Sequence, residues 1–159
     1  METRDYIALI SAVLALTALY LNNYYANQRE RRKEFRGRLD KINSYIEDMR
    51  EIAFSFFTQD YSLKDSEKIL YSFETLYRMI QSTHHFSNDE SISGSFTNYK
   101  RAVTLNNFDK SSFSIQREDA DILKEIYYSS ESLIERLEEI YSRKFPLGVR
   151  PFASRILGH

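Results

Sequence analysis

Residues 6–28 contain no charged side chain, and this stretch limits what the chain can become more than any other feature. A helix needs about 20 mostly apolar residues to cross ~30 Å of hydrocarbon. The segment Tyr6–Leu21 supplies 16 residues and is interrupted only by Ser11 and Thr17, whose hydroxyls can hydrogen-bond back onto a helix. Extension to Ala26 reaches the required length. The sequence therefore predicts a short external N-terminus and a transmembrane helix within residues 1–26.

An apolar N-terminal stretch can also be a secretory signal peptide or a buried helix of a soluble protein. A signal peptide begins with basic residues and ends at a small-residue cleavage site. This chain begins METRD, and Tyr24 occupies the position before Ala26 that should be small. A buried core helix is seldom so long without a charge. Both comparisons favour a membrane anchor.

The charges that flank the apolar stretch predict its orientation. Residues 29–41 hold seven basic and three acidic side chains, whereas the first five residues hold one basic and two acidic side chains. Short basic flanks stay in the cytoplasm, so we expect an inner-membrane protein of a bacterium with its N-terminus outside. This basic cluster can also contact anionic lipid headgroups. Nucleic-acid binding is the competing interpretation of the cluster, and its position beside a predicted membrane span argues against that interpretation. The topology-determining residues are Arg29, Arg31, Arg32, Lys33, Arg36 and Arg38.

One face of the predicted span is made of small residues. Such faces let helices approach closely in lipid, where packing replaces the hydrophobic drive. The sequence therefore suggests self-association through this face, although alanine is also common in bacterial spans. The candidate oligomer face contains Ala8, Ser11, Ala12, Ala15, Ala18 and Asn22.

The remainder of the chain has the composition of one modest all-α domain. Only four glycines and two prolines occur among the 159 residues, together with many helix-forming residues. The absence of cysteine excludes disulfides, thiolate metal sites and cysteine nucleophiles. We therefore predict a cytoplasmic bundle of about four helices over residues 27–145, followed by a basic apolar tail over residues 146–159.

Apolar spacing predicts where these helices run. A heptad seam of the coiled-coil type continues the span without a break from Phe35 to Phe56. A second helix begins after a break at residues 58–64, with Ser62 or Asp65 as its cap, and ends near residues 83–86. A polar loop is expected over residues 87–95 and a weaker helix over 95–106. The last helix is expected to begin with Glu118 and to end at Phe145-Pro146.

Charge is divided sharply near the C-terminus. Residues 118–139 hold eight acids and two bases, whereas residues 143–159 hold four bases and no acid. Three fates of the tail are compatible with this division. It can lie on the inner leaflet, dock across the acidic helix of a neighbouring subunit, or be a frayed terminus.

The sequence contains none of the constellations that common catalytic chemistries need. It has no glycine-rich phosphate loop, no HExxH and no paired ExxH motifs. Adjacent histidines on a helix point about 100° apart, so His84 and His85 are expected to form a helix end rather than a metal site. Glu135 and Glu138 share a helix face as many solvated carboxylates do. We therefore expect no enzymatic activity, no metal and no cofactor.

An anionic small-molecule signal remains a candidate ligand for the bundle. Basic residues can gather around an anion, and symmetry in an oligomer would repeat each of them around one axis. An aromatic ring beside them can stack on a nucleobase. The candidate contacts are Tyr99, Lys100, Arg101, Arg143, Lys144 and Arg150.

The Tyr6–Lys41 anchor region and the helical pattern after it resemble small bacterial membrane-anchored proteins of mobile elements and phage-defence loci. These place one or two spans before a compact helical sensor domain. In some accessory effectors of type III CRISPR systems that domain binds cyclic oligoadenylate, and the protein perturbs the membrane. The resemblance implies a role in antiviral defence or toxicity. It matches the layout and no specific residue, so it assigns no site.

Three functions are therefore compatible with the sequence. The first is a non-enzymatic, homo-oligomeric membrane protein whose cytoplasmic domain binds a protein partner or a signal and acts at the membrane. The second is a tether or scaffold that recruits another protein through the bundle. The third is a membrane-bound enzyme whose site has no recognisable motif.

Overall fold

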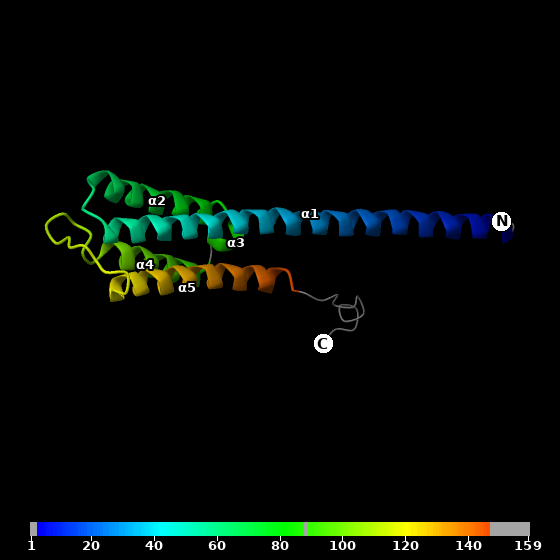
Figure 1. The fold of residues 1–159 in the computed structure, drawn as a ribbon. Helices are drawn as coiled ribbons and strands as arrows, with labels where there is room; N and C mark the ends of the chain where they lie inside the picture. Colours follow the sequence, from blue (N-terminus) through cyan, green and yellow to red (C-terminus); the bar gives the residue numbers. More distant parts are fainter. Residues whose placement is uncertain (1–2, 88, 147–159) are drawn as a thin grey trace. The chain divides into compact units, whose positions relative to one another are not determined.

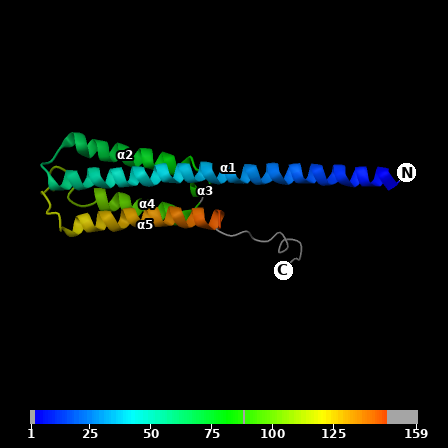
Figure 2. The same cartoon turned by 45° about the vertical axis from the view of Figure 1, so that its right-hand side comes forward.

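The computed structural model describes residues 3–87 and 89–146, and every regular element within them is an α-helix. Figures 1 and 2 show the order of the helices along the chain. The chain divides into two compact units, residues 1–37 and 38–159. The five helices are α1 (Thr3–Thr58), α2 (Leu63–Gln81), α3 (His84–Ser87), α4 (Glu90–Thr104) and α5 (Asp121–Lys144). The predicted all-α fold, a long apolar N-terminal helix followed by a helical bundle, is confirmed.

The first unit contains only the beginning of α1. Its large apolar side chains from Tyr6 to Tyr25 are all exposed. Within it the Thr17 hydroxyl donates to the backbone oxygen of Val13 at 2.8 Å, which is the local hydrogen bond expected of a threonine in an apolar helix. Among the described residues, one helix is long and apolar enough to span a membrane, with a mean hydropathy of 1.6 over its most apolar window.

The second unit is a bundle of four long helices, namely the remainder of α1 together with α2, α4 and α5 (Figures 1 and 2). The predicted seam on α1 is confirmed, because each of its apolar positions is buried. Burial of one face at a spacing of three and four residues is what an amphipathic helix requires. The seam residues of this unit are Leu39, Ile42, Ile46, Met49, Ala53 and Phe56; Phe35, the predicted seam position in the first unit, is buried as well.

The connection from α1 to α2 agrees with the sequence. Helix α1 ends at Thr58, and the Ser62 hydroxyl caps α2 by accepting from the backbone N–H of Asp65 at 3.2 Å. Asp65 lies in the first turn, where its negative charge favours the positive end of the helix. Of the two predicted caps, Ser62 is therefore the one that is used.

The predicted loop over residues 87–95 is wrong in most of its length, because α4 begins at Glu90. The Asp89 carboxylate caps this helix and accepts from the backbone N–H of Ser91 at 2.9 Å. Ile92 is buried one turn later and anchors the helix against the core. The Asp89 cap, and the burial of Ile92 in register with Tyr99 and Val103 later on the helix, favour a helix through this serine-rich stretch that contains Gly94.

The connection from α4 to α5, residues 105–120, closes one end of the bundle with aromatic rings. Phe56 of α1 lies at the centre of this aromatic cluster. The centroid of its ring is 5.4 Å from that of Phe108 and 5.2 Å from that of Phe113. The backbone N–H of Gln116 also donates to the oxygen of Phe57 at 2.7 Å. Aromatic pairs at such distances prefer tilted or edge-to-face geometry, as these do. The long connection is therefore attached to the core rather than free of it.

Candidate functional site

The apolar segment of α1 carries the predicted oligomer face in helical form. At about 100° per residue, its six positions fall within an arc of about 120°. All six residues are exposed along this part of the helix. The segment thus presents one strip of small side chains, whereas larger side chains such as Leu14, Leu16 and Tyr20 cover the rest of its surface.

The predicted topology-determining residues also lie on α1, in the turns that follow the apolar segment. Lys33 pairs with Glu30 at 3.1 Å, and both side chains are well exposed. An exposed pair of this kind contributes little to stability, about 0–1 kcal/mol. The helix therefore displays this basic cluster on the same continuous element as the apolar segment.

The residues predicted to contact an anion do not come together. Lys100 and Arg101 lie near the end of α4, whereas Arg143 pairs with Asp89, the residue that caps the beginning of α4, at 3.8 Å. Eleven residues separate Asp89 from Lys100, which is ~16 Å along a helix. Within one bundle the pair Lys100 and Arg101 and the pair Arg143 and Lys144 are thus at opposite ends. The sixth candidate, Arg150, lies outside the described residues.

Tyr99 is removed from the candidate ligand contacts because its side chain is completely buried. Its ring packs on Phe73 with centroids 5.2 Å apart, and its hydroxyl donates to the backbone oxygen of Ile46 at 3.5 Å. Burial raises the pKa of this phenol well above its ordinary value, with Arg50 opposing the shift. Tyr99 is therefore a neutral core residue and cannot stack on a ligand.

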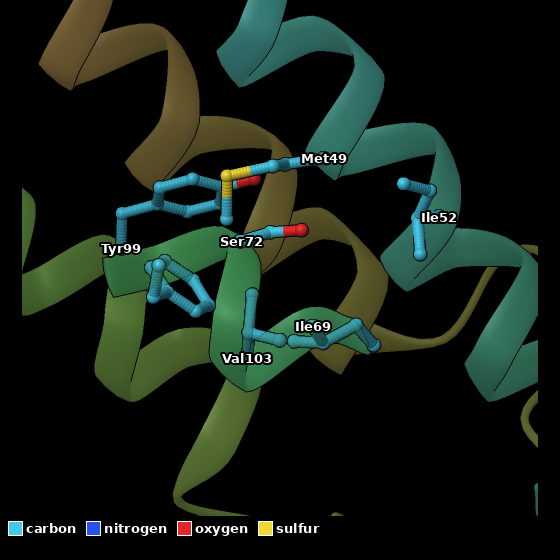
Figure 3. Close-up of a pocket in the computed structure, with 7 residues that line it drawn as sticks. Met49, Ile52, Ile69, Ser72, Tyr99 and Val103 are labelled. Atoms are coloured by element: carbon cyan, nitrogen blue, oxygen red, sulfur yellow. The ribbon is translucent and has the colours of Figure 1, made fainter. Parts of the chain in front are cut away.

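The space around Tyr99 is a packing feature rather than a binding site. Figure 3 shows side chains from α1, α2 and α4 converging there. The space between them does not admit a water-sized molecule. A void of this kind is a normal consequence of fitting branched and aromatic side chains together. The residues that surround it are Met49, Ile52, Ile69, Ser72, Phe73, Tyr99 and Val103.

A polar seam between α1 and α5 was not predicted from the sequence. Arg50 donates to the Ser130 hydroxyl at 3.3 Å, pairs with the Glu131 carboxylate and lies 4.9 Å from the centroid of the Tyr127 ring. One heptad earlier on α1, the Asn43 amide donates to Glu138 at 3.0 Å. Only 18% of the Arg50 side chain is exposed, so these contacts replace much of the water around its guanidinium group.

The spacing of these four polar residues contains a signal for the seam. Asn43 and Arg50 are seven residues apart on one helix, and Glu131 and Glu138 are seven apart on the other. Two pairs at matching heptad spacing define one antiparallel alignment of the helices. Ser130 acts both as a small packing residue and as a polar contact, since it is fully buried and also donates to the Tyr127 backbone oxygen at 2.8 Å.

The two histidines are the first two residues of the short helix α3 (His84–Ser87), and His85 lies near Lys144 in the last turn of α5. Their ring centroids are 5.4 Å apart. Desolvation, followed by the charges of Lys144 and His84, lowers the pKa of His85. Within the described residues no group of three or more histidine, aspartate or glutamate side chains is placed to hold a metal ion.

A shallow polar groove of about 500 Å³ lies between α4 and α5. Asp121 and Lys124 line it and pair with each other at 3.0 Å, and the exposed ring of Tyr128 flanks them. The remaining lining is made of hydroxyl, amide and carboxylate side chains. Such a wide and paired surface offers hydrogen-bonding groups but no enclosed pocket for a small molecule.

Comparison with known proteins adds no family to these observations. No protein-family model, curated protein or solved structure matches the chain significantly. The functional argument therefore depends on the residues described above.

Proposed function

We propose that the chain is a non-enzymatic, single-pass protein of a bacterial inner membrane. Its helical bundle lies in the cytoplasm, binds a protein partner or an anionic signal, and acts at the membrane as a homo-oligomer. Antiviral defence, suggested by the layout of the sequence, is the biological role that we propose for this action.

The observation that carries this proposal is the exposed apolar surface of α1 from Tyr6 to Tyr25. Apolar side chains cover every side of the helix there, and all the large ones are exposed. Apolar surface left in water costs about 25 cal/mol per Å². A hydrocarbon layer removes that cost, because the helix satisfies its own backbone hydrogen bonds inside lipid.

The basic cluster supports the proposed orientation, and the strip of small residues supports self-association. Positive side chains next to a span remain on the cytoplasmic side, so the bundle that follows them is placed there. A strip of alanines permits close approach of two helices in lipid. Because the basic pairs of one bundle are far apart, an anion site would need residues from more than one copy.

The membrane assignment is tested by fractionation of cells that express the full chain with a C-terminal reporter. We expect the protein to stay in the membrane pellet after alkaline carbonate extraction. Green fluorescent protein at the C-terminus should fluoresce, whereas alkaline phosphatase at the same place should be inactive. Release by carbonate would overturn the span, and the opposite reporter pattern would overturn the orientation.

Self-association is tested by the mass of the purified full chain in detergent. We expect a discrete oligomer that is weakened by Ala12→Leu or Ala15→Leu, since each adds bulk to the small face. Val13→Leu, outside that face, is the matched control. A strictly monomeric protein at all concentrations would contradict the oligomeric part of the proposal. Membrane leakage on overexpression, lost in the same two variants, would connect the oligomer to an action on the bilayer.

A further inference from the structure

The long helices of the second unit follow one another around the bundle in the order α1, α2, α4 and α5. Helices α1 and α2 are joined by residues 59–62, and α2 meets α4 where the ring centroids of Phe73 and Phe96 are 6.1 Å apart. Helix α4 packs along α5, and α5 returns to α1 through the polar seam. The surface over α2 and α4 (the α2–α4 side) is therefore opposite the surface over α1 and α5 (the α1–α5 side).

The α2–α4 side combines apolar surface with a positive charge. Leu70 and Tyr77 are seven residues apart on α2, so they point the same way, and each is about half exposed. The Tyr77 ring lies 5.6 Å from that of Phe96 on α4. Lys100 follows Phe96 by one turn and is exposed on the same face of α4. Among the described residues Lys100 has no ion-pair partner.

The α1–α5 side combines an exposed ring with a negative charge. Tyr127 is about half exposed and lies against Arg50, whose charge is already paired with Glu131. Glu47 precedes Arg50 by three residues on the same side of α1 and is exposed. Within the part of the chain that the structure describes, Glu47 forms no ion pair. The charges that the two sides offer are thus complementary.

The two free charges lie near one level along the bundle. The Tyr99 hydroxyl crosses the core and donates to the backbone oxygen of Ile46 at 3.5 Å. Lys100 follows Tyr99 on α4, and Glu47 follows Ile46 on α1. The lysine and the glutamate therefore project from opposite sides of the bundle at nearly the same height.

The exposed apolar residues of the two sides also lie near one level. Ile69 of α2 shares a packed region with Met49 of α1 (Figure 3). The residues that follow them are Leu70 on the α2–α4 side and Arg50, whose guanidinium carbon is 4.9 Å from the centroid of the Tyr127 ring. Leu70 and Tyr127 are therefore matched in height, as the two charges are.

A membrane anchor makes this matching of heights meaningful. Copies that are anchored by α1 in one bilayer share one orientation, and they differ by rotation about the membrane normal and by displacement in its plane. A group on one bundle therefore meets groups of its own height on the next bundle. Two complementary pairs at matched heights then allow one copy to contact another through opposite sides.

We propose that the bundles associate side by side, with the α2–α4 side of one copy against the α1–α5 side of the next. Lys100 pairs with Glu47 of the neighbouring copy, and Leu70 packs against its Tyr127. Because the two sides are opposite, the contact is heterologous and joins copies into a ring or a row. This inference rests on the proposed function for the common orientation of the anchored copies, and it names the surface that the oligomer uses outside the membrane.

Zero-length cross-linking tests the charged pair in the unmodified chain. A carbodiimide joins an amine to a carboxylate only where the two are in contact. Full-length protein of normal and heavy nitrogen, mixed and re-equilibrated in detergent, should give a mixed-isotope cross-link between Lys100 and Glu47. Within one bundle these groups point to opposite sides and cannot be joined. An oligomer that gives no cross-link at this pair, or gives it only within single chains, would overturn the proposal.

Charge reversal tests whether the pair holds copies together. Lys100→Glu and Glu47→Lys should each weaken association about tenfold, because each places like charges across the contact. The double variant restores opposite charges at every contact and should recover association. Lys68→Glu is the matched control, since Lys68 is exposed and lies about 200° from Leu70 around α2. The mass of the full chain over a dilution series in detergent measures all four variants. Failure of the double variant to recover, or an equal loss in the control, would overturn the pairing.

The apolar contact is tested by a pair of leucines. Leu70→Gln should weaken association severalfold, because it removes apolar surface from the contact. Leu105→Gln changes an exposed leucine that follows α4 and lies outside the contact, so it should have no effect. Equal behaviour of the two variants in the same dilution series would overturn the placement of Leu70 in the interface.

The bundle contact and the membrane function can fail separately. A protein that resists carbonate extraction and forms oligomers sensitive to Ala12→Leu, but insensitive to charge reversal at Lys100 and Glu47, would overturn the bundle contact alone. Release by carbonate would overturn the proposed membrane function and, with it, the common orientation that this contact requires.

Discussion

The two parts of helix α1 differ in the distribution of their apolar side chains. From Tyr6 to Tyr25 these side chains cover all sides of the helix, and all the large ones are exposed. From Leu39 to Phe56 they recur every three or four residues and are buried, whereas charged residues such as Asp40 and Glu47 are exposed on the other side. The two parts thus differ in charge content and in angular distribution: an apolar surface on all sides suits lipid, whereas an apolar stripe opposite charged residues suits a protein core.

The same substitution should destabilise the bundle in one part and leave it unchanged in the other, and this is the largest effect that we expect. Ile46→Ala removes a fully buried side chain and should reduce the free energy of unfolding of the bundle by about 2–5 kcal/mol. Ile10→Ala removes an exposed one and should leave that value unchanged. Urea unfolding of the purified full chain, followed by circular dichroism, measures both. Equal losses would show that Ile10 is also packed against the bundle.

A charge placed in the first part tests its suitability for lipid. Leu14→Arg should oppose membrane insertion by about 3 kcal/mol, the cost of an arginine near the centre of a span. The fraction of protein that resists carbonate extraction should therefore fall, whereas Leu14→Ala should change it little. The bundle should unfold at the same urea concentration in both variants. Unchanged extraction of Leu14→Arg would mean that this part of α1 does not reside in hydrocarbon.

The second part of α1 tolerates a partly buried charge because α5 supplies its partners. Arg50→Ala removes the ion pair with Glu131, the hydrogen bond to Ser130 and the contact with the Tyr127 ring. We expect a loss of about 1–3 kcal/mol in the free energy of unfolding. Lys124→Ala, which removes an exposed pair with Asp121, should cost no more than about 0.5 kcal/mol. Equal costs would show that Arg50 is solvated and that the polar seam contributes no more than a surface pair.

Strong periodic patterns made most of the fold predictable from the sequence. The continuous first helix, its buried seam and the Ser62 cap all follow from local spacing and capping chemistry. The beginning of α4 was not predicted, because Asn88 to Ser95 have the composition of a loop. Ile92 lies seven and eleven residues before the buried Tyr99 and Val103 and therefore continues their helical spacing, but the serine-rich composition around it hid this signal.

The candidate site was less predictable, because its residues come from separate helices. Basic side chains at positions 100–101 and 143–144 are equally polar in sequence, and only the antiparallel arrangement of α4 and α5 places them at opposite ends. Tyr99 lies next to Lys100, and this neighbour suggested that its ring contacts a ligand. The complete burial of Tyr99 shows instead that it is a core residue. The matching heptads of Asn43–Arg50 and Glu131–Glu138 become informative once the two helices are known to be neighbours.

Gly37 stands where the two parts of α1 meet, and it gives the smallest expected effect. The compact units divide immediately after it, although α1 has no break there. A Cβ added at Gly37 would meet open space, so Gly37→Ala should raise the helical stability by up to about 1 kcal/mol. Gly94→Ala in α4 is the matched control, since its Cβ also meets open space and the same gain is expected. Thermal unfolding of both variants measures the difference. A gain in stability for Gly94→Ala with none for Gly37→Ala would contradict this expectation. It would show that α1 is not a continuous helix at Gly37 in solution.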